Sequence, residues 1–338
     1  DILNGNVNNL TIIWLYDKFC ERRQIMGEKE IRGFPGGVHP TDGQDKSLTA
    51  GKLVKEYWPG SVTILSEQSL NAKCSLMVKP GDQVLAGQLI GEPQSFAAAP
   101  LHASVSGIVR EVKKISSQDR EILACVIERT GEPEEKSFPH ENEAADISEY
   151  SEDVIIEGLL TGGLIGMGGA GFPVHKKYET EKRIDTILIN GAECELFLTC
   201  DCRVMVEQGY GVINGTRLML KASGADQAYI CIEDNKPDAI KNLQKILEEM
   251  KSQGYFEKEK PVQVQVLPTK YPQGGERQLI ESVLGREVPM GGLPADVGVI
   301  VSNVGTAKAA ADVVLGKKPL ISRIVTVTGN VKEPGNYL

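Results

Sequence analysis

The chain has 338 residues, of which 41% are hydrophobic and 25% are charged, as in ordinary globular proteins. Its net charge of −9 argues against a nucleic-acid partner, because phosphate binding normally needs a basic face. No apolar run reaches the ~18 residues of a membrane-spanning helix, so we predict no transmembrane segment.

The seven cysteines are scattered along the chain and include no Cys-x-x-Cys pair. Neither a zinc ribbon nor an iron–sulfur cluster is therefore encoded, and we predict free thiols and no metal site. Residues 1–30 carry no motif and are interpreted as an N-terminal extension. Because the chain begins with Asp1 instead of Met, we expect a fragment or a processed product of a longer protein.

Residues 31–135 are predicted to form a small β domain, because short apolar segments alternate with Gly and Pro turns. The expected strands include 61–65, 76–78, 84–85 and 107–112. Segments 78–91 and 98–109 resemble the two half-motifs of biotinyl and lipoyl carrier domains. Those domains carry a lysine between the halves, whereas residues 92–107 contain none, so no swinging cofactor arm can be attached. We therefore expect an unlysinated, barrel-like β-sandwich used for docking, with His102 in a structural or interface role.

An acidic segment, residues 136–153, is expected to link this domain to a second one that spans 154–318. Apolar runs at 185–189, 227–232, 262–266 and 297–301 predict strands. Helical spacing predicts helices at 151–160, 203–222, 236–251 and 275–284. This alternation is typical of an α/β fold with a mainly parallel, Rossmann-like sheet covered by helices.

The most informative segment, residues 162–178, has glycine at six of its first ten positions and a basic cluster after them. Glycine lets the backbone approach a ligand closely, and consecutive amides can point at phosphate oxygens. Residues 166–171 fit the pattern Gly-x-Gly-x-x-Gly, but a helix precedes them and Phe172-Pro173 follows. The segment therefore fits an ordinary Rossmann turn poorly, and both a structural turn and an unconventional nucleotide or flavin loop stay open.

Three polar segments follow predicted strands and so share the carboxyl edge of the sheet, where ligands of such sheets gather. They are 190–195 (Asn-Gly-Ala-Glu-Cys-Glu), 271–277 (Tyr-Pro-Gln-Gly-Gly-Glu-Arg) and 302–306 (Ser-Asn-Val-Gly-Thr). Each one alone could be a solvated turn. In this order, and together with the glycine-rich segment, they become specific for a binding site.

The last segment, residues 319–338, is predicted to begin a further domain with a β-hairpin punctuated by Pro334-Gly335. A strand that ends at Tyr337-Leu338 without partners would be unusual for a native terminus. More chain is therefore expected after it.

Together these motifs resemble the NADH-oxidising flavoprotein subunit of respiratory complex I and, more closely, the RnfC family of Rnf-type electron-transport complexes. The segments that match the second family are 36–40, 166–173, 190–195 and 271–276. The unlysinated sandwich matches it as well, and the resemblance covers roughly residues 31–338. It implies that residues 319–338 open a soluble-ligand-binding β-grasp (SLBB) domain.

By this resemblance, the site would bind FMN and NADH and pass a hydride from the dinucleotide to the flavin. The contacts would come from Gly166, Gly168, Gly169, Gly171, Phe172, Lys177, Asn190, Glu193, Tyr271, Gly274, Glu276, Asn303 and Thr306. The glycines would wrap the flavin, and Asn303 and Thr306 would bind its phosphate with neutral donors. Lys177 would stabilise the negative charge of reduced flavin, Glu193 would contact the flavin, and Glu195 would help to place NADH. These last three are the candidate catalytic residues.

The resemblance further implies the NADH-oxidising module of a membrane-associated complex, peripheral on the cytoplasmic face of the bacterial inner membrane and bound to the other Rnf subunits. Electrons would leave through [4Fe–4S] clusters, whose Cys-x-x-Cys runs this sequence lacks, so clusters are expected only in a full-length protein. Two alternatives stay open. One is a cobalamin reductase of a bacterial microcompartment, which shares the flavin loop and the sandwich, and the other is a non-catalytic docking scaffold.

Overall fold

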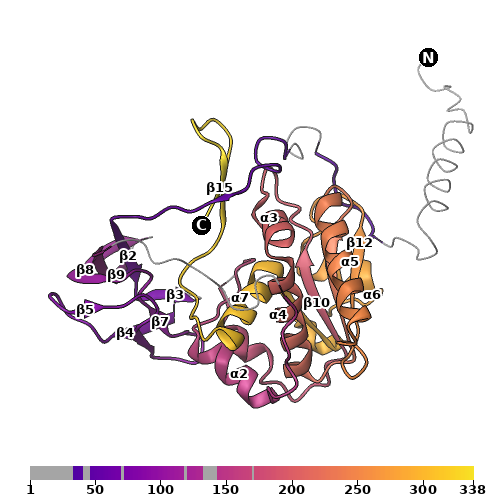
Figure 1. Cartoon of the computed structure of the whole chain (residues 1–338), viewed down its shortest axis with the longest axis horizontal. Helices are drawn as coiled ribbons and strands as arrows, with labels where there is room; N and C mark the ends of the chain where they lie inside the picture. Colours follow the sequence, from indigo (N-terminus) through magenta and orange to yellow (C-terminus); the bar gives the residue numbers. More distant parts are fainter. Residues whose placement is uncertain (1–32, 41–45, 70–71, 118–119, 132–142, 170) are drawn as a thin grey trace, which may run out of the picture.

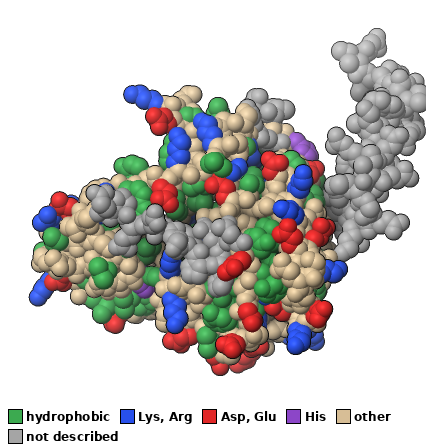
Figure 2. Space-filling model, in the orientation of Figure 1, with side chains coloured by type: hydrophobic (Ala, Val, Ile, Leu, Met, Phe, Trp, Pro, Cys, Tyr) green, Lys and Arg blue, Asp and Glu red, His purple; other side chains and the backbone are tan. Residues whose placement is uncertain are grey.

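The structure is a computed structural model, and it describes residues 33–40, 46–69, 72–117, 120–131, 143–169 and 171–338. The expectation for residues 1–30 lies outside this part of the chain. No helix within the described residues has both the length and the apolar character needed to cross a membrane. Figure 1 shows a β domain beside a larger α/β domain. On the face drawn in Figure 2, acidic and basic side chains are interspersed, and the described residues form no continuous basic patch there.

The β domain is a sandwich of two four-stranded antiparallel sheets, in the orders β2-β9-β8-β5 and β3-β4-β6-β7. The strands are β2 (Ser61–Leu65), β3 (Glu67–Ser69), β4 (Ala72–Leu76), β5 (Gln83–Val84), β6 (Leu89–Pro93), β7 (Leu101–His102), β8 (Gly107–Ser117) and β9 (Arg120–Arg129). Ile90, Val109 and Ile127 are fully buried in its core, because alternate residues of each strand face inward. The sandwich is confirmed, but the strand expected at 76–78 ends at Leu76, because a turn follows in which Asp82 accepts a hydrogen bond from the backbone two residues after Met77.

The α/β domain is built on a four-stranded parallel sheet in the order β12-β11-β10-β13. Its strands are β10 (Thr186–Gly191), β11 (Gln227–Glu233), β12 (Val262–Leu267) and β13 (Val299–Asn303). All four coincide closely with the predicted strands, so the mainly parallel sheet is confirmed. The central strand β10 is buried on both faces, since Ile187 and Ile189 belong to one hydrophobic cluster and Leu188 belongs to another.

Helices cover both faces of this sheet (Figure 1). They are α2 (Glu152–Thr161), α3 (Cys200–Glu207), α4 (Gly209–Ser223), α5 (Pro237–Ser252), α6 (Glu276–Leu284) and α7 (Val304–Leu315), with the short 3₁₀ turns η1 (Val174–Lys177) and η2 (Pro294–Val297). The cluster around Ile187 draws on α2 to α5 and α7, whereas α6 packs against Leu188 on the opposite face through Leu279. Helices α4 and α7 cross closely, since a Cβ on Gly215 would lie 1.6 Å from the Ala307 carbonyl oxygen.

Two expectations about helices are corrected by the structure. The helix predicted at 203–222 is two helices, because Gln208 leaves the helical conformation (φ −128°, ψ 34°) and α4 starts at the next residue. Helix α5 passes so close to this break that a Cβ on Gly209 would lie 2.7 Å from the Ile246 side chain. Residues 302–306, expected as a turn, contain the end of β13 and the first turn of α7, whose cap is the Asn303 side chain.

A third sheet, in the order β1-β15-β14, joins β1 (Val54–Lys55) to the C-terminal hairpin of β14 (Val325–Val327) and β15 (Gly335–Tyr337). The hairpin is confirmed. However, Tyr337 and Leu338 do not lack partners, because β15 is the middle strand and Leu338 bonds to the backbone of Lys55 and Tyr57. Whether this hairpin belongs to a β-grasp domain stays a prediction.

Candidate functional site

The carboxyl ends of β10 and β13 lie side by side, with Asn190 in register with Asn303. The Asn190 side-chain amide donates a hydrogen bond to the Gly274 carbonyl (2.8 Å), which brings in the loop after β12. The Asn303 amide donates to the Asn190 carbonyl (3.4 Å). The three polar segments predicted at this edge are therefore in contact, as the order of the parallel strands requires.

The glycine-rich segment lies over the start of α7. The Met167 amide donates a hydrogen bond to the Thr306 hydroxyl (3.0 Å), and the Gly166 amide donates to the Phe172 carbonyl (2.8 Å), which closes the loop on itself. A Cβ on Gly168 would lie 2.9 Å from the Asn303 Cβ, so glycine is needed for this approach. The loop opens the short turn η1 and no α-helix, which agrees with its poor fit to a Rossmann turn.

The far side of the same loop contacts the sandwich. Gly171 has a left-handed φ of 65°, and its carbonyl accepts a hydrogen bond from the Ser69 hydroxyl (2.6 Å). A Cβ on Gly163 would lie 3.1 Å from His102 Nδ1. The unlysinated region of the sandwich therefore packs against the glycine-rich segment, and the position of His102 agrees with the structural or interface role expected for it.

Two glycines of the loop face open space. A Cβ on Gly169 would meet no described atom within 4 Å, and one on Gly166 would lie 3.6 Å from the nearest atom. By contrast, contacts within the fold already occupy the space around Gly168 and Gly171. A flat or anionic ligand can approach the backbone at the open positions without meeting a side chain, so this loop fits FMN.

Lys177, at the end of η1, reaches the same edge of the sheet. Its ammonium donates a hydrogen bond to the Val301 carbonyl (2.5 Å). Burial lowers the pKa of Lys177 below its usual range, and the nearby Glu276 carboxylate opposes this shift. The candidate cation and the first residue of α6 are therefore close enough to interact electrostatically.

Glu193 follows β10 in a left-handed conformation (φ 49°), with its side chain only 2% exposed. Its Oε1 accepts a hydrogen bond from the Asp201 amide (2.7 Å), while its Oε2 has no hydrogen-bond partner among the described residues. Burial, with repulsion from the Asp201 carboxylate as the next cause, raises the pKa of Glu193 to about 7. Burial also raises the pKa of Asp201, against a hydrogen bond of 2.6 Å that its carboxylate accepts from Asn303. Two electrostatically coupled carboxyl groups thus lie at this edge.

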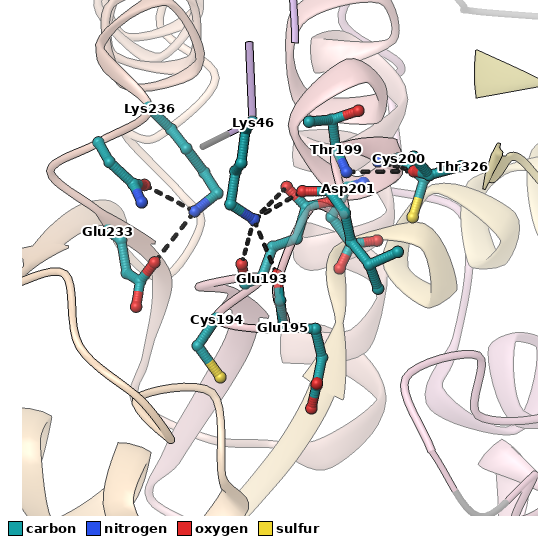
Figure 3. A network of polar contacts seen from close by, with 12 residues as sticks. Lys46, Glu193, Cys194, Glu195, Thr199, Cys200, Asp201, Glu233, Lys236 and Thr326 are labelled. Atoms are coloured by element: carbon teal, nitrogen blue, oxygen red, sulfur yellow. Dashed lines mark hydrogen bonds and ion pairs between the residues drawn. The ribbon is translucent and has the colours of Figure 1, made fainter. Parts of the chain in front are cut away.

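Two buried lysines support the loop after β10 (Figure 3). Lys46 donates hydrogen bonds to three backbone carbonyls of the loop, those of Glu193 (2.6 Å), Glu195 (3.2 Å) and Leu198 (2.6 Å). Lys236, which follows β11, donates to the Ala192 carbonyl (2.5 Å) and to the Glu233 carboxylate (3.2 Å). Ammonium groups from two other segments therefore hold the turn that carries the candidate carboxylates.

The remaining candidate residues lie at the rim of the site. Glu195 is exposed, and its side chain points away from Lys46 in Figure 3. Tyr271 is half-buried, and its backbone pairs with Val38 through two hydrogen bonds of 2.8 Å, which ties residues 33–40 to this edge. A ligand can therefore reach both candidate side chains from solvent.

One group of side chains has the composition of a metal site. Oxygens of Glu193 and Asp201 and the sulfur of Cys200 lie within 4.8 Å of one another. Metal binding would need the thiolate, whereas burial raises the pKa of Cys200 to about 12, so the thiol is protonated at neutral pH. We therefore do not assign a metal centre to this group.

A cavity of about 340 Å³ adjoins the site, between the sandwich, the helices α3 and α7, and residues 317–324. Asn303 is the only candidate residue in its described lining. The cavity therefore differs from the sheet edge at which Asn190, Lys177 and Gly274 gather, and the chemistry of the side chains favours that edge as the site.

Comparison with known proteins follows the two domains. Residues 32–132 match the model of the RnfC barrel sandwich hybrid domain, and residues 160–312 match that of the Nuo51 FMN-binding domain. Over 91% of its length, the chain is 41% identical to the RnfC-type subunit of the proton-translocating ferredoxin:NAD⁺ oxidoreductase complex of Clostridium ljungdahlii. The chain belongs to the RnfC family. A second relative, the corresponding subunit of the Na⁺-translocating ferredoxin:NAD⁺ oxidoreductase complex of Acetobacterium woodii, is 38% identical over 89% of this RnfC chain.

This RnfC chain spans 65% and 66% of the lengths of these two relatives. A solved structure, an NAD⁺-reducing [NiFe]-hydrogenase in its H₂-reduced state, is similar with a TM-score of 0.50 and 25% sequence identity. The similarity covers 56% of this chain and 37% of the hydrogenase chain.

The charged groups beneath the site of this RnfC chain are not among the residues chosen from the sequence. They are Lys46, Asp201, Glu233 and Lys236. Residues 233–236 carry a usable signal, since they follow a predicted strand as the three chosen segments do. No spacing or motif connects Lys46 to the site, because 147 residues separate it from Glu193.

Proposed function

We propose that this chain is the NADH-oxidising flavoprotein module of an Rnf-type complex, with FMN held at the carboxyl edge of the parallel sheet. The observation that carries the proposal is the open face of the glycine loop at Gly166 and Gly169, beside the ends of β10 and β13. The match of residues 160–312 to an FMN-binding domain supports it. The open loop favours a ligand site over a docking scaffold.

The chemistry of each residue suggests its role. The glycine-loop amides and the N-terminus of α7 would hold the flavin phosphate, with Asn303 and Thr306 as neutral donors, because helix N-termini favour anions. Lys177 would compensate negative charge near the flavin ring, and Asn190 and Glu193 would contact the ring and the ribityl chain. Bound FMN would supply the conversion of a hydride into single electrons. The residues on the dinucleotide side would be Glu195, Tyr271, Gly274 and Glu276.

We further propose that the module works with the other Rnf subunits at the cytoplasmic face of the bacterial inner membrane. Electrons would continue to iron–sulfur clusters outside this sequence. The two relatives are named as subunits of ferredoxin:NAD⁺ oxidoreductase complexes, and these names favour electron transport over cobalamin reduction.

Anaerobic titration of the purified chain with FMN and then with NADH tests the proposal. We expect FMN to bind with one site per chain and NADH to bleach its visible absorption, whereas free FMN mixed with NADH serves as the blank. Adding ferricyanide or a cob(III)alamin afterwards compares a one-electron acceptor with cobalamin. A chain that binds no FMN, or whose FMN stays oxidised in NADH, contradicts the proposal.

A further inference from the structure

Lys46 makes an unusual set of contacts for a lysine outside the α/β domain. Its ammonium donates to the carbonyls of Glu193, Glu195 and Leu198 at 2.6, 3.2 and 2.6 Å. An ammonium has three protons, so these three acceptors use all of them. The side chain is 11% exposed, and the acceptors lie 147 to 152 residues further along the chain. One buried cation therefore gathers the carbonyls of a whole loop.

The loop that Lys46 holds has no regular backbone hydrogen bonding of its own. Between the end of β10 and the start of α3, Glu193 and Phe197 adopt left-handed conformations, with φ of 49° and 64°. Non-glycine residues adopt such conformations at a cost in energy, and surrounding contacts must compensate for it. Lys46 supplies those contacts at both ends of the loop. The loop also carries both carboxylates that we propose to face the ligands.

Lys46 also acts on Glu193 through its charge. The charged and titratable groups facing Glu193 are Lys46, Lys236, Asp201, Cys200 and Cys202, and Glu233 faces the two lysines. Lys236 is paired with Glu233 at 3.2 Å. The ammonium of Lys46 lies 3.7 Å from Glu193 Oε2, the oxygen without a hydrogen-bond partner. Lys46 is therefore the cation whose charge is left to balance Glu193.

We propose that Lys46 is a positioning residue for NADH oxidation, which fixes the shape of residues 193–198 and keeps the Glu193 carboxylate ionised. In this form Glu193 accepts hydrogen bonds from the flavin side, and Glu195 is presented to the dinucleotide. Burial and Asp201 raise the pKa of Glu193, and Lys46 opposes both. This inference rests on the proposed function, and it assigns to Lys46 an effect on both geometry and charge.

Steady-state oxidation of NADH by the FMN-loaded chain, with ferricyanide as acceptor, separates these effects across pH. In Lys46→Met we expect kcat/KM for NADH to fall roughly ten- to a hundredfold, because small displacements of positioning groups have effects of that size. The acidic limb of the pH profile should move up by about one pH unit, because the compensating cation is lost. In Lys46→Arg the limb should stay in place while KM stays raised, since a planar guanidinium keeps the charge but cannot direct donors at three converging carbonyls.

Lys52→Met is the matched control. Lys52 also precedes β1 and donates to a backbone carbonyl, that of Pro334 (2.6 Å), but in an exposed position away from the loop. This variant should keep the wild-type KM and pH profile. FMN content and the helical circular dichroism signal show whether each variant is folded.

The outcomes distinguish the inference from the function on which it rests. Wild-type chain that NADH does not reduce contradicts the proposed function. Active wild type together with a Lys46→Met variant of unchanged KM and unchanged acidic limb overturns the inference alone. If Lys46→Met does not fold, Lys46→Arg and Glu193→Gln decide. An acidic limb that persists in Glu193→Gln, or that shifts in Lys46→Arg, overturns the role of the charge pair.

Discussion

The side-chain amide of Asn303 donates a 2.6 Å hydrogen bond to the buried carboxylate of Asp201, although 102 residues separate them. The other end of the same amide caps α7, since Asn303 Oδ1 accepts a hydrogen bond from the Gly305 amide (2.8 Å). One side chain therefore connects the last strand of the sheet, the start of α7 and the first turn of α3. This arrangement makes Asn303 important for stability as well as for the proposed phosphate contact.

Asn303→Ala should lower the free energy of unfolding of the α/β domain by roughly 2 to 4 kcal/mol. The helix cap accounts for about 1 kcal/mol and the hydrogen bond to a charged acceptor for the rest. Urea denaturation followed by the helical circular dichroism signal measures this, because the described helices all lie in that domain. Asn303→Ser keeps a capping oxygen and should lose less. Equal stability of wild type and Asn303→Ala would show that the two hydrogen bonds contribute nothing.

Gly168 and Gly169 should respond differently to the same substitution. Gly169→Val places its side chain in open space, so it should fold normally but lose FMN, whose approach to the backbone it blocks. Gly168→Val should be destabilised with or without FMN, because its Cβ would lie 2.9 Å from the Asn303 Cβ. Flavin fluorescence titration and thermal unfolding separate the two effects. Retention of FMN by Gly169→Val would refute the proposed position of the flavin.

The parts of the fold that the sequence predicts best are those with strong hydrophobic patterns. Strand β2 lies where the alternation of 61–65 places it, and the four parallel strands are apolar because β10 is covered on both faces. Helix α7 is not predicted beyond its first turn. Its residues 304–314 are small and buried almost all round, so they show no polar face and no helical periodicity.

The site follows the same division. Asn190, Gly274 and Asn303 can be found from the sequence because each follows a predicted strand and parallel strands bring their carboxyl ends together. Lys46 cannot be found in this way, because its segment reaches the site through tertiary contacts without regular structure. The break at Gln208 is also hidden, since its cause is the approach of α5.

Lys177→Met should lower the midpoint potential of the bound flavin. The ammonium lies at the end of β13 and favours negative charge on a reduced ligand, so its removal leaves that charge uncompensated. We expect a decrease of about 30 mV, which corresponds to about 1.4 kcal/mol for a two-electron couple. Lys176→Met is the control, because the neighbouring lysine instead pairs with Glu179 at 2.7 Å. An unchanged potential in a spectroelectrochemical titration would remove the proposed role of Lys177.

Glu193 should make the stability of the apo chain decrease with pH in a defined window. Burial raises its pKa from the ordinary 4.5 to about 7, so between these values the folded chain holds a proton that the unfolded chain releases. The contribution to stability is therefore fully present below pH 4.5 and is lost as the pH rises through about 7. Asp201 shifts in the same direction and adds to the decrease.

Glu193→Gln is neutral at every pH and should lack the part of this decrease that belongs to Glu193. Relative to wild type, its free energy of unfolding should therefore improve by roughly 2 to 3 kcal/mol between the acidic and the alkaline end of the window. Urea denaturation at several pH values measures the difference. Glu195→Gln serves as the control, because this exposed carboxylate of the same loop should leave the pH dependence parallel to that of wild type. If Glu193→Gln also runs parallel to wild type, Glu193 is ionised in the folded chain throughout the window, and its burial is compensated more fully than the contacts of Lys46 and Asp201 indicate.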